Sequence, residues 1–254
     1  MGLQKTEAIV LRSYKLGEKD KIVIFFTRDF GKVRGVAKSS RQLISRFGSC
    51  LELFSHIWLI FFEKEGQELV KINQCDLLKS YFEAQQDLLV GGHLAYFSEL
   101  IIEFLPERDV SQPIFRLVLE LLAGIAQGLD IHYIARYFEL WLLKLQGFLP
   151  LWEERCRKCS RELFIDSQAV YIQAQGLICN SCNSSSSAKS LPLSKRAFNI
   201  IQFMLKNRIN RMKILRIKKD ALEEIAQLNH FLITHFLEKE LKSYQYLKNM
   251  NIYN

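Results

Sequence analysis

The fold of the first third of the chain is decided by residues 21–37, which read KIVIFFTRDFGKVRGVA. Two runs rich in β-branched and aromatic residues, 21–27 and 31–37, flank the turn signal Asp29-Phe30-Gly31. This pattern predicts two consecutive β-strands. Similar runs at residues 8–14, 51–62 and 68–78 predict three more strands around this pair.

Five short strands at the start of the chain favour a small closed barrel, and the oligonucleotide-binding (OB) barrel is the commonest five-stranded solution. From residue 81 onward the apolar period becomes helical. We expect one buried helix over residues 81–105, a second that begins at Ser111-Gln112-Pro113 and a third over residues 131–145. Two more helices should follow residue 190, the first capped by Ser194 and the last by Asp220 in a capping-box pattern.

Four cysteines interrupt the helical part in the pattern Cys156-x-x-Cys159 and Cys179-x-x-Cys182, with nineteen residues between the pairs. This spacing is typical of a four-cysteine zinc ribbon, in which each pair contributes two ligands from one tight turn. The strand-like residues 170–172 and Gly176 predict a small hairpin between the pairs. The alternative interpretations are unrelated buried cysteines or a redox pair, and two pairs at ribbon spacing favour zinc over both.

A site with four thiolates leaves no ligand position for water or substrate, so we expect one structural Zn²⁺ and not a catalytic one. The deaminase signature is also missing, because none of the five histidines is followed by Glu two positions later. Cys50 and Cys75 are placed on predicted strands, and we interpret both as core residues.

The sequence therefore predicts an α+β protein: an N-terminal five-stranded OB-type β-barrel followed by an all-α helical domain with a four-cysteine zinc-ribbon insert. The expected boundaries are 1–80 for an OB-fold DNA-binding domain, 81–150 for the first part of the helical domain, 151–190 for the zinc-binding insert and 191–254 for the second helical part.

Charge is distributed by segment. The chain has a formal net charge of +8, which divides into +7 over residues 1–50, −7 over 51–150 and +8 over 151–254. Within residues 28–46, six Lys or Arg accompany a single acid, Asp29. On a small barrel, basic loops and exposed rings of this kind contact single-stranded nucleic acid. The available rings are Tyr14, Phe30 and Phe47, for each of which core packing is the favoured alternative.

A second basic cluster spans residues 206–219, which hold seven Lys or Arg and no acid. Three interpretations stay open at this stage: a DNA contact, a grip on the acidic tail of a partner protein, or a polar connector between helices.

Catalytic motifs are missing. The sequence has no Walker loop, no dinucleotide-binding glycine motif, no nucleophile elbow and no His-Glu-x-x-His. It also lacks an apolar signal-peptide region in residues 1–20 and any apolar run long enough to span a bilayer. We therefore expect a non-enzymatic, cytoplasmic binding protein that does not contact membranes.

Three strings of residues resemble a known family: Glu7-Ala8-Ile9-Val10-Leu11, Tyr14-Lys15-Leu16-Gly17-Glu18-Lys19-Asp20 and Phe30-Gly31-Lys32-Val33-Arg34-Gly35-Val36-Ala37-Lys38. Together with the basic stretch up to Arg46-Phe47 and the helical part with its four-cysteine insert, they resemble RecO, the bacterial recombination mediator family. The resemblance covers essentially the whole chain.

The resemblance implies binding to single- and double-stranded DNA, annealing of complementary strands, and partnership with RecR and the single-stranded-DNA-binding protein, so that RecA is loaded onto coated DNA. It places the DNA-contacting residues at Lys38 and Arg41, and further at Arg34 and Arg46. Where the family often has Gly and a second basic residue after the Ala-Lys pair, this chain has Ser39-Ser40-Arg41-Gln42. The rival functions are a zinc-containing nucleic-acid-processing enzyme and a scaffold that binds acidic protein tails.

Overall fold

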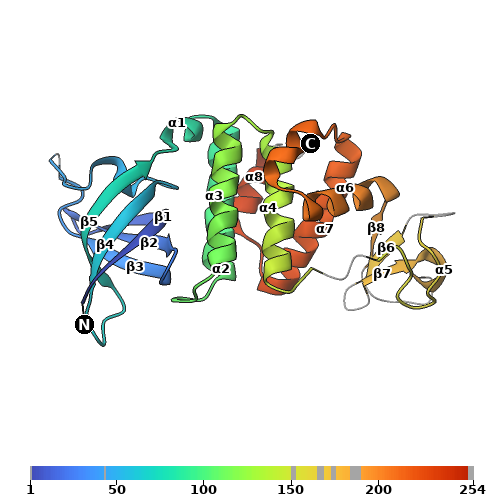
Figure 1. The fold of residues 1–254 in the computed structure, drawn as a ribbon, viewed down its shortest axis with the longest axis horizontal. Coiled ribbons are helices and arrows are strands. Elements are labelled where there is room, and N and C mark those ends of the chain that lie inside the picture. The colour runs from blue at the N-terminus through green and yellow to red at the C-terminus, as the bar shows by residue number, and fades with distance from the viewer. Residues whose placement is uncertain are drawn as a thin grey trace. The chain divides into compact units, whose positions relative to one another are not determined.

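The computed structural model describes residues 2–42, 44–149, 153–164, 169–172, 176–183 and 190–250 (Figure 1). Contacts divide the chain into two compact units: unit 1 comprises Met1–Ala126 and Glu240–Asn254, and unit 2 comprises Gln127–Lys239. The domain boundaries expected at residues 80 and 190 stay predictions, and the one at residue 150 lies outside the described residues. Nowhere in the described ranges is a helix long and apolar enough to cross a membrane.

Unit 1 starts with the five predicted strands: β1 (Gly2–Leu16), β2 (Asp20–Thr27), β3 (Gly31–Ala37), β4 (His56–Glu63) and β5 (Val70–Lys79). They pair in the order β1-β2-β3-β5-β4, and β4 also pairs with β1, so the sheet closes on itself. Inward-facing residues from all five strands, among them Val10, Phe25, Val33, Leu59 and Ile72, form its core. The alternation of side chains along each strand is what gathers these apolar groups on the inner face.

The prediction of a strand over residues 51–62 was wrong at its beginning. Residues Gly48–Leu51 form the short 3₁₀ helix η1, and β4 starts only at His56. The adjacent residues Cys50 and Leu51 are both buried in this turn. The turn is closed by hydrogen bonds from the N–H of Cys50 to the carbonyl of Phe47 (3.0 Å) and from the N–H of Glu52 to that of Ser49 (3.3 Å).

The remaining elements of unit 1 are helices: α1 (Phe82–Gln85), α2 (Leu88–Phe104), α3 (Gln112–Ala126) and α8 (Lys242–Asn249). The single helix expected over residues 81–105 is interrupted at Asp87. The carboxylate of this residue accepts hydrogen bonds from the backbone N–H groups of Leu89 (2.8 Å) and Val90 (3.0 Å), which caps and begins α2.

The helices of unit 1 pack directly on the closed sheet. The rings of Phe26 in β2 and Phe115 in α3 have centroids 5.6 Å apart, and the hydroxyl of Ser98 in α2 donates to the carbonyl of Leu11 in β1. The turn between β2 and β3 lies under the connection between α2 and α3. A Cβ atom at Gly31, whose φ is +63°, would lie 2.3 Å from the carbonyl oxygen of Asp109, so this position requires glycine.

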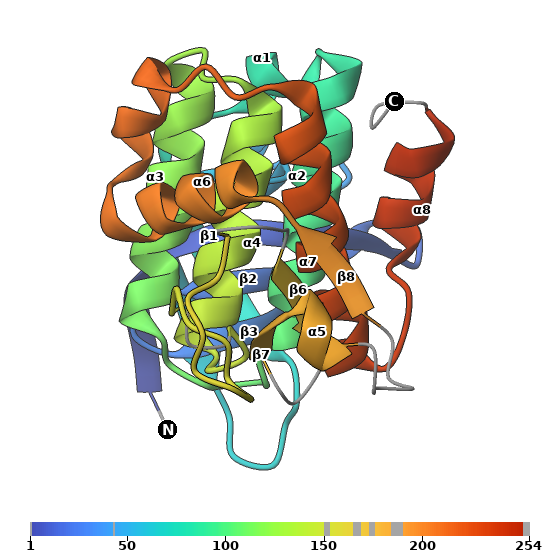
Figure 2. The ribbon, with the colours of Figure 1, turned by 90° about the vertical axis from the view of Figure 1, so that its right-hand side faces the viewer.

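Unit 2 consists of α4 (Ile131–Leu145), β6 (Ala169–Ile172), β7 (Gly176–Cys179), α5 (Asn180–Asn183), β8 (Ser190–Leu193), α6 (Lys195–Lys206), η2 (Ile209–Ile214) and α7 (Lys219–Leu237). Its three strands pair in the order β7-β6-β8. Figure 2 shows β8 leading into α6, and the chain then passing through η2 to α7.

The two expected caps in unit 2 have different outcomes. Ser194 is confirmed as the N-cap of α6, because its hydroxyl accepts from the N–H of Ala197 at 3.1 Å. The expectation for Asp220 was wrong: α7 starts at Lys219 with Lys218 as its N-cap, so Asp220 lies inside the first turn. There its carboxylate lies 3.6 Å from the guanidinium of Arg196 in α6. Its negative charge also interacts favourably with the positive end of the helix dipole.

Candidate metal centre and candidate nucleic-acid surface

The first cysteine pair lies in a tight turn that closes on itself. The N–H of Cys156 donates to the carbonyl of Arg161 (2.7 Å), and the N–H of Ser160 donates back to the carbonyl of Cys156 (2.8 Å). Ser160 has a φ of +58°, a conformation that usually favours glycine. This turn brings the side chains of Cys156 and Cys159 to the same side of the chain.

The second pair is presented by a strand end and the helical turn that follows it. Cys179 is the last residue of β7, and Cys182 lies in α5. The two pairs are joined directly, because the N–H of Arg157 donates to the carbonyl of Leu177 at 3.0 Å. The N–H of Cys179 also points to the sulfur of Cys156, at 3.3 Å.

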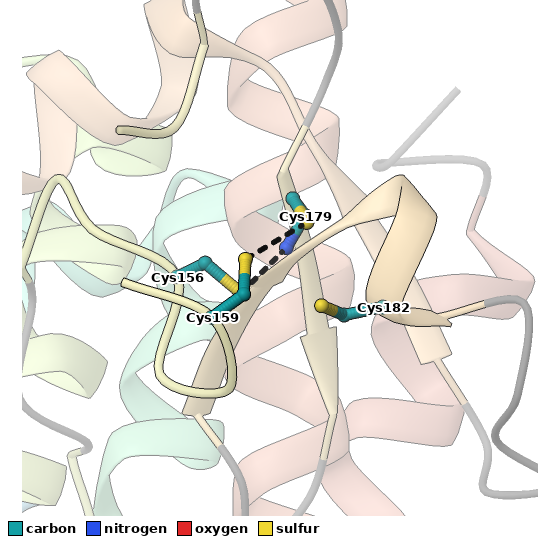
Figure 3. Close-up of side chains that lie close together, drawn as sticks. All are labelled: Cys156, Cys159, Cys179 and Cys182. Atoms are coloured by element: carbon teal, nitrogen blue, oxygen red, sulfur yellow. Dashed lines mark hydrogen bonds between the residues drawn. The ribbon is translucent and has the colours of Figure 1, made fainter. Parts of the chain in front are cut away.

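The four cysteine sulfurs lie within 4.8 Å of one another (Figure 3), and those of Cys159 and Cys179 are 3.7 Å apart. A tetrahedral ion with metal–sulfur bonds of about 2.3 Å holds its sulfurs about 3.8 Å apart. The four side chains therefore fit a single metal ion, and all four come from the cysteines that the sequence spacing indicated.

The pKa values of Cys156 and Cys182 are shifted in opposite directions. Burial alone would raise the pKa of Cys156, but the backbone N–H groups of Cys179, Cys159 and Lys158 outweigh it and lower that pKa to about 6. Hydrogen bonds with the sulfurs of Cys159 and Cys179 raise the pKa of Cys182 to about 12. The cluster thus holds a thiolate at neutral pH, and a bound cation would displace the remaining protons.

The other two cysteines are core residues, as expected. Cys50 and Cys75 are buried in unit 1, and the thiol of Cys50 donates to the carbonyl of Cys75 at 3.3 Å. Burial and the neighbouring Cys50 raise the pKa of Cys75 to about 12, so this thiol stays protonated. Cys50 lies in η1 and not on a strand.

The four expected DNA-contacting residues differ in the exposure and in the partners of their charged groups. Lys38 and Arg41 are exposed just after β3. The backbone N–H of Arg41 donates to the carbonyl of Lys19 (3.0 Å) and its side chain to the carbonyl of Gly17 (2.6 Å), which places it beside the β1–β2 turn.

Arg34 and Arg46 have more partners within unit 1. The guanidinium of Arg34 lies 3.6 Å from Glu68 and 3.8 Å from Glu107. Arg46 is exposed, with its guanidinium 4.8 Å from the ring centroid of Phe47. We expect the charge of Arg34 to be partly neutralised, whereas that of Arg46 faces an aromatic ring.

Two cations of the same basic stretch are structural. The ammonium of Lys32 is buried, donates to the carbonyl of Ile102 at 2.6 Å and lies 3.4 Å from Glu107. Arg28 is paired with Glu7 at 3.6 Å. Of the rings considered, Phe47 is buried and Phe30 packs edge-on against Phe61 in the sheet core, whereas Tyr14 is 46% exposed.

The structure adds cations that sequence reasoning missed. Lys15 and Lys21 are cross-strand partners in the β1–β2 hairpin, and Lys21 is in turn paired with Ala37, next to Lys38. Lys19 lies in the turn that Arg41 contacts. We call Lys15, Lys19, Lys21, Lys38 and Arg41 the hairpin surface. The sequence feature that could have revealed this surface is the turn at Gly17, because the hairpin register around it pairs the residues that flank the turn.

The two matching family models divide the chain much as the five strands and the later elements do. The N-terminal model of recombination protein O matches residues 1–81, and its C-terminal model matches residues 85–245. The two models together show that this chain, with its closed five-stranded sheet, its later helices and its four-cysteine cluster, is a recombination protein.

Curated relatives agree along most of the chain. A DNA repair protein RecO of Koribacter versatilis is 37% identical over 70% of this chain and 71% of its own. The DNA repair protein RecO of Syntrophus aciditrophicus is 30% identical over 96% of this chain and 94% of its own, and that of Dehalococcoides mccartyi is 28% identical over 97% and 96%. The chain belongs to the RecO family, and its role lies in DNA repair and recombination.

Proposed function

We propose that this protein is a non-enzymatic recombination mediator that binds single- and double-stranded DNA and anneals complementary strands. The observation that carries the proposal is the hairpin surface, a group of five cations beside the open end of a closed five-stranded sheet in a RecO-family chain. Such a surface attracts the phosphate backbone by counterion release and needs no nucleotide hydrolysis.

The closed sheet is, in this proposal, a barrel of the oligonucleotide-binding type. In such barrels the face of strands two and three and the adjoining loops bind the nucleic acid. Lys21 of β2 and Lys38, just beyond β3, lie at that position. Family membership supports RecR, the single-stranded-DNA-binding protein and, indirectly, RecA as partners, and a cytoplasmic place of action.

DNA binding is tested by salt titration of single-strand affinity. Substituting Lys38→Ala or Arg41→Ala should lower the slope of log affinity against log salt by about one each, because each removes one phosphate contact. Arg34→Ala should change the slope less, since two carboxylates already face that guanidinium. Lys64→Ala, at an exposed cation beyond β4, is the matched control. Unchanged slopes for Lys38→Ala and Arg41→Ala would place the DNA contacts elsewhere.

Annealing of complementary oligonucleotides without nucleotide or magnesium separates a mediator from a nucleic-acid-processing enzyme. We expect annealing with both strands intact at the end of the reaction. Shortened strands would favour the enzyme. DNA affinity that does not respond to salt, combined with binding of acidic peptides, would favour the scaffold.

We further propose that the four cysteines hold one structural Zn²⁺. Cys156→Ser should abolish stoichiometric zinc, because a tetrahedral site with three thiolates loses affinity, and should destabilise unit 2. Cys75→Ser, at a cysteine outside the cluster, should keep one zinc per chain. The measurement is zinc content of the purified variants by elemental analysis. Full zinc content in Cys156→Ser would refute the four-thiolate assignment.

A further inference from the structure

A second group of cations lies in unit 2, on the connection between α6 and α7. We call residues 206–219 the connector. Six of its exposed residues are cations that follow one another alternately two and three positions apart in the sequence. They are Lys206, Arg208, Arg211, Lys213, Arg216 and Lys218. In Figure 2 the connector is the stretch of chain that joins the helices labelled α6 and α7.

The backbone of the connector is held in place by aromatic side chains of α4. The indole N–H of Trp141 donates to the carbonyl of Met204 at 3.0 Å, at the end of α6. The hydroxyl of Tyr137 donates to the carbonyl of Asn207 at 3.2 Å, and the hydroxyl of Tyr133 accepts from the N–H of Ile217 at 3.1 Å. These residues are spaced four apart, so they form one row on the helix that fixes both ends of the connector.

The middle of the connector is fixed by its 3₁₀ geometry. Residues three apart lie on the same edge of a 3₁₀ helix. In η2 this places Ile209 and Met212 on one edge, where both are buried. Arg211 and Lys213 lie on the other edges of η2 and are exposed. The basic side chains of the connector therefore extend from a backbone whose position is fixed.

The carboxylates at the start of α7 are already engaged with other groups. Asp220 lies 3.6 Å from Arg196, and Glu223 lies 3.8 Å from Lys219. Glu224 accepts the N–H of Ser194 at 2.7 Å. Within the described part of the chain, no carboxylate lies within ion-pair distance of the six cations from Lys206 to Lys218. Their charge is therefore available to a partner.

We propose that the connector is a second DNA-binding surface, which contacts the phosphate backbone of one strand independently of the hairpin surface. Six exposed cations without a carboxylate partner in the described part of the chain form a surface that attracts phosphates, and two of them, Arg211 and Lys213, lie on η2. The six residues of η2 span about 12 Å at about 2 Å per residue, which is three to four bases of a strand at about 3.4 Å each. This step rests on the proposed function: a second surface lets one chain hold both strands that it anneals.

The inference goes beyond the proposed function, and the two can fail separately, because the cations belong to different units. A connector variant carries Arg208→Gln, Arg211→Gln and Lys213→Gln in the full-length chain. The matched control carries Lys64→Gln, Arg116→Gln and Lys248→Gln, which removes the same charge from exposed positions elsewhere. A hairpin variant carries Lys38→Gln and Arg41→Gln.

The readout is the number of fluorescent oligo(dT) strands bound per chain at low salt, together with energy transfer between donor- and acceptor-labelled strands on one chain. We expect two strands for the unsubstituted chain and the control. The connector variant should bind one strand, lose the energy transfer and anneal complementary strands at least about tenfold more slowly. Its salt slope should fall by about three relative to the unsubstituted chain.

The proposal is overturned if the connector variant binds and anneals like the control, or if the unsubstituted chain holds a single strand. It is also overturned if the connector variant keeps its DNA stoichiometry but loses binding to a polyglutamate peptide, since the partner would then be an acidic protein segment. A loss in the connector variant without any change in the hairpin variant supports the connector and counts against the hairpin surface.

Discussion

At the scale of single residues, a buried ion pair stands out in the core of unit 2. The guanidinium of Arg136 lies 2.6 Å from the carboxylate of Glu139, and their side chains are 3% and 2% exposed. The amide of Asn229 in α7 donates to the other oxygen of Glu139 at 2.9 Å. This arrangement links α4 to α7 through charge and hydrogen bonding inside an apolar bundle.

Glu139→Gln should therefore be strongly destabilising. It removes the negative charge that faces the buried guanidinium, and breaking one partner of a buried pair costs about 3–5 kcal/mol of unfolding free energy. Replacing both partners, as Arg136→Met with Glu139→Leu, should recover most of that loss, because apolar side chains of similar size need no pairing. Denaturant unfolding checks both. A loss below about 1 kcal/mol in Glu139→Gln would show that water reaches this pair.

At the scale of elements, one carboxylate of α2 caps the beginning of α8. Glu99 in α2 accepts from the backbone N–H groups of Ser243 (2.8 Å) and Lys242 (3.3 Å) and from the hydroxyl of Ser243. These are the first N–H groups of α8, which has no side-chain cap of its own. A negative charge at this position also interacts favourably with the helix dipole.

Glu99→Ala should loosen α8 without unfolding the sheet. Hydrogen bonds to a charged acceptor contribute about 1.5–3 kcal/mol, so amides in Lys242–Asn249 should exchange at least about tenfold faster. Glu83→Ala, at an exposed carboxylate of α1 in the same unit, is the control. Equal exchange rates in the two variants would mean that apolar contacts such as those of the buried Leu247 hold the helix.

At the scale of the whole molecule, the four-cysteine cluster belongs to one of two compact units. All four cysteines lie in Gln127–Lys239. A ligand stabilises the state that binds it, so metal should stabilise unit 2 by mass action and leave unit 1 unchanged. The molecule should then respond to chelation in one part only.

Treatment with a chelator should abolish hydrogen-exchange protection around Leu177 and Ile178, which are buried beside the cluster. Protection at Val10 and Val23 in the closed sheet of unit 1 should persist. Cys156→Ser, which we expect to bind no metal, is the control and should show no further change on chelation. Equal loss of protection in both units would mean that the two unfold as one cooperative body.

The comparison between pattern and structure is clearest for the basic residues. Lys32 and Lys38 belong to the same run, yet Lys32 is buried against the carbonyl of Ile102, seventy residues away, and Lys38 is exposed. Local composition does not distinguish them, because the difference comes from a helix packed over one of the two. The start of β4 and the break at Asp87 were missed for a related reason. Hydrogen bonds that close the turn at Gly48–Leu51, and the side-chain cap at Asp87, interrupt an apolar run whose composition does not reveal them.

By itself, the sequence determined the five strands, the helical part, the four-cysteine cluster and the family. These depend on alternation, spacing and strings of residues, all of which are local properties of the chain. The tertiary structure alone decided which cations keep a free charge. Arg34 is faced by Glu68 and Glu107, whereas the exposed cations of the connector stand on a backbone held by α4. Neutralising a charge requires a partner within a few ångströms, and only folding brings distant residues that close.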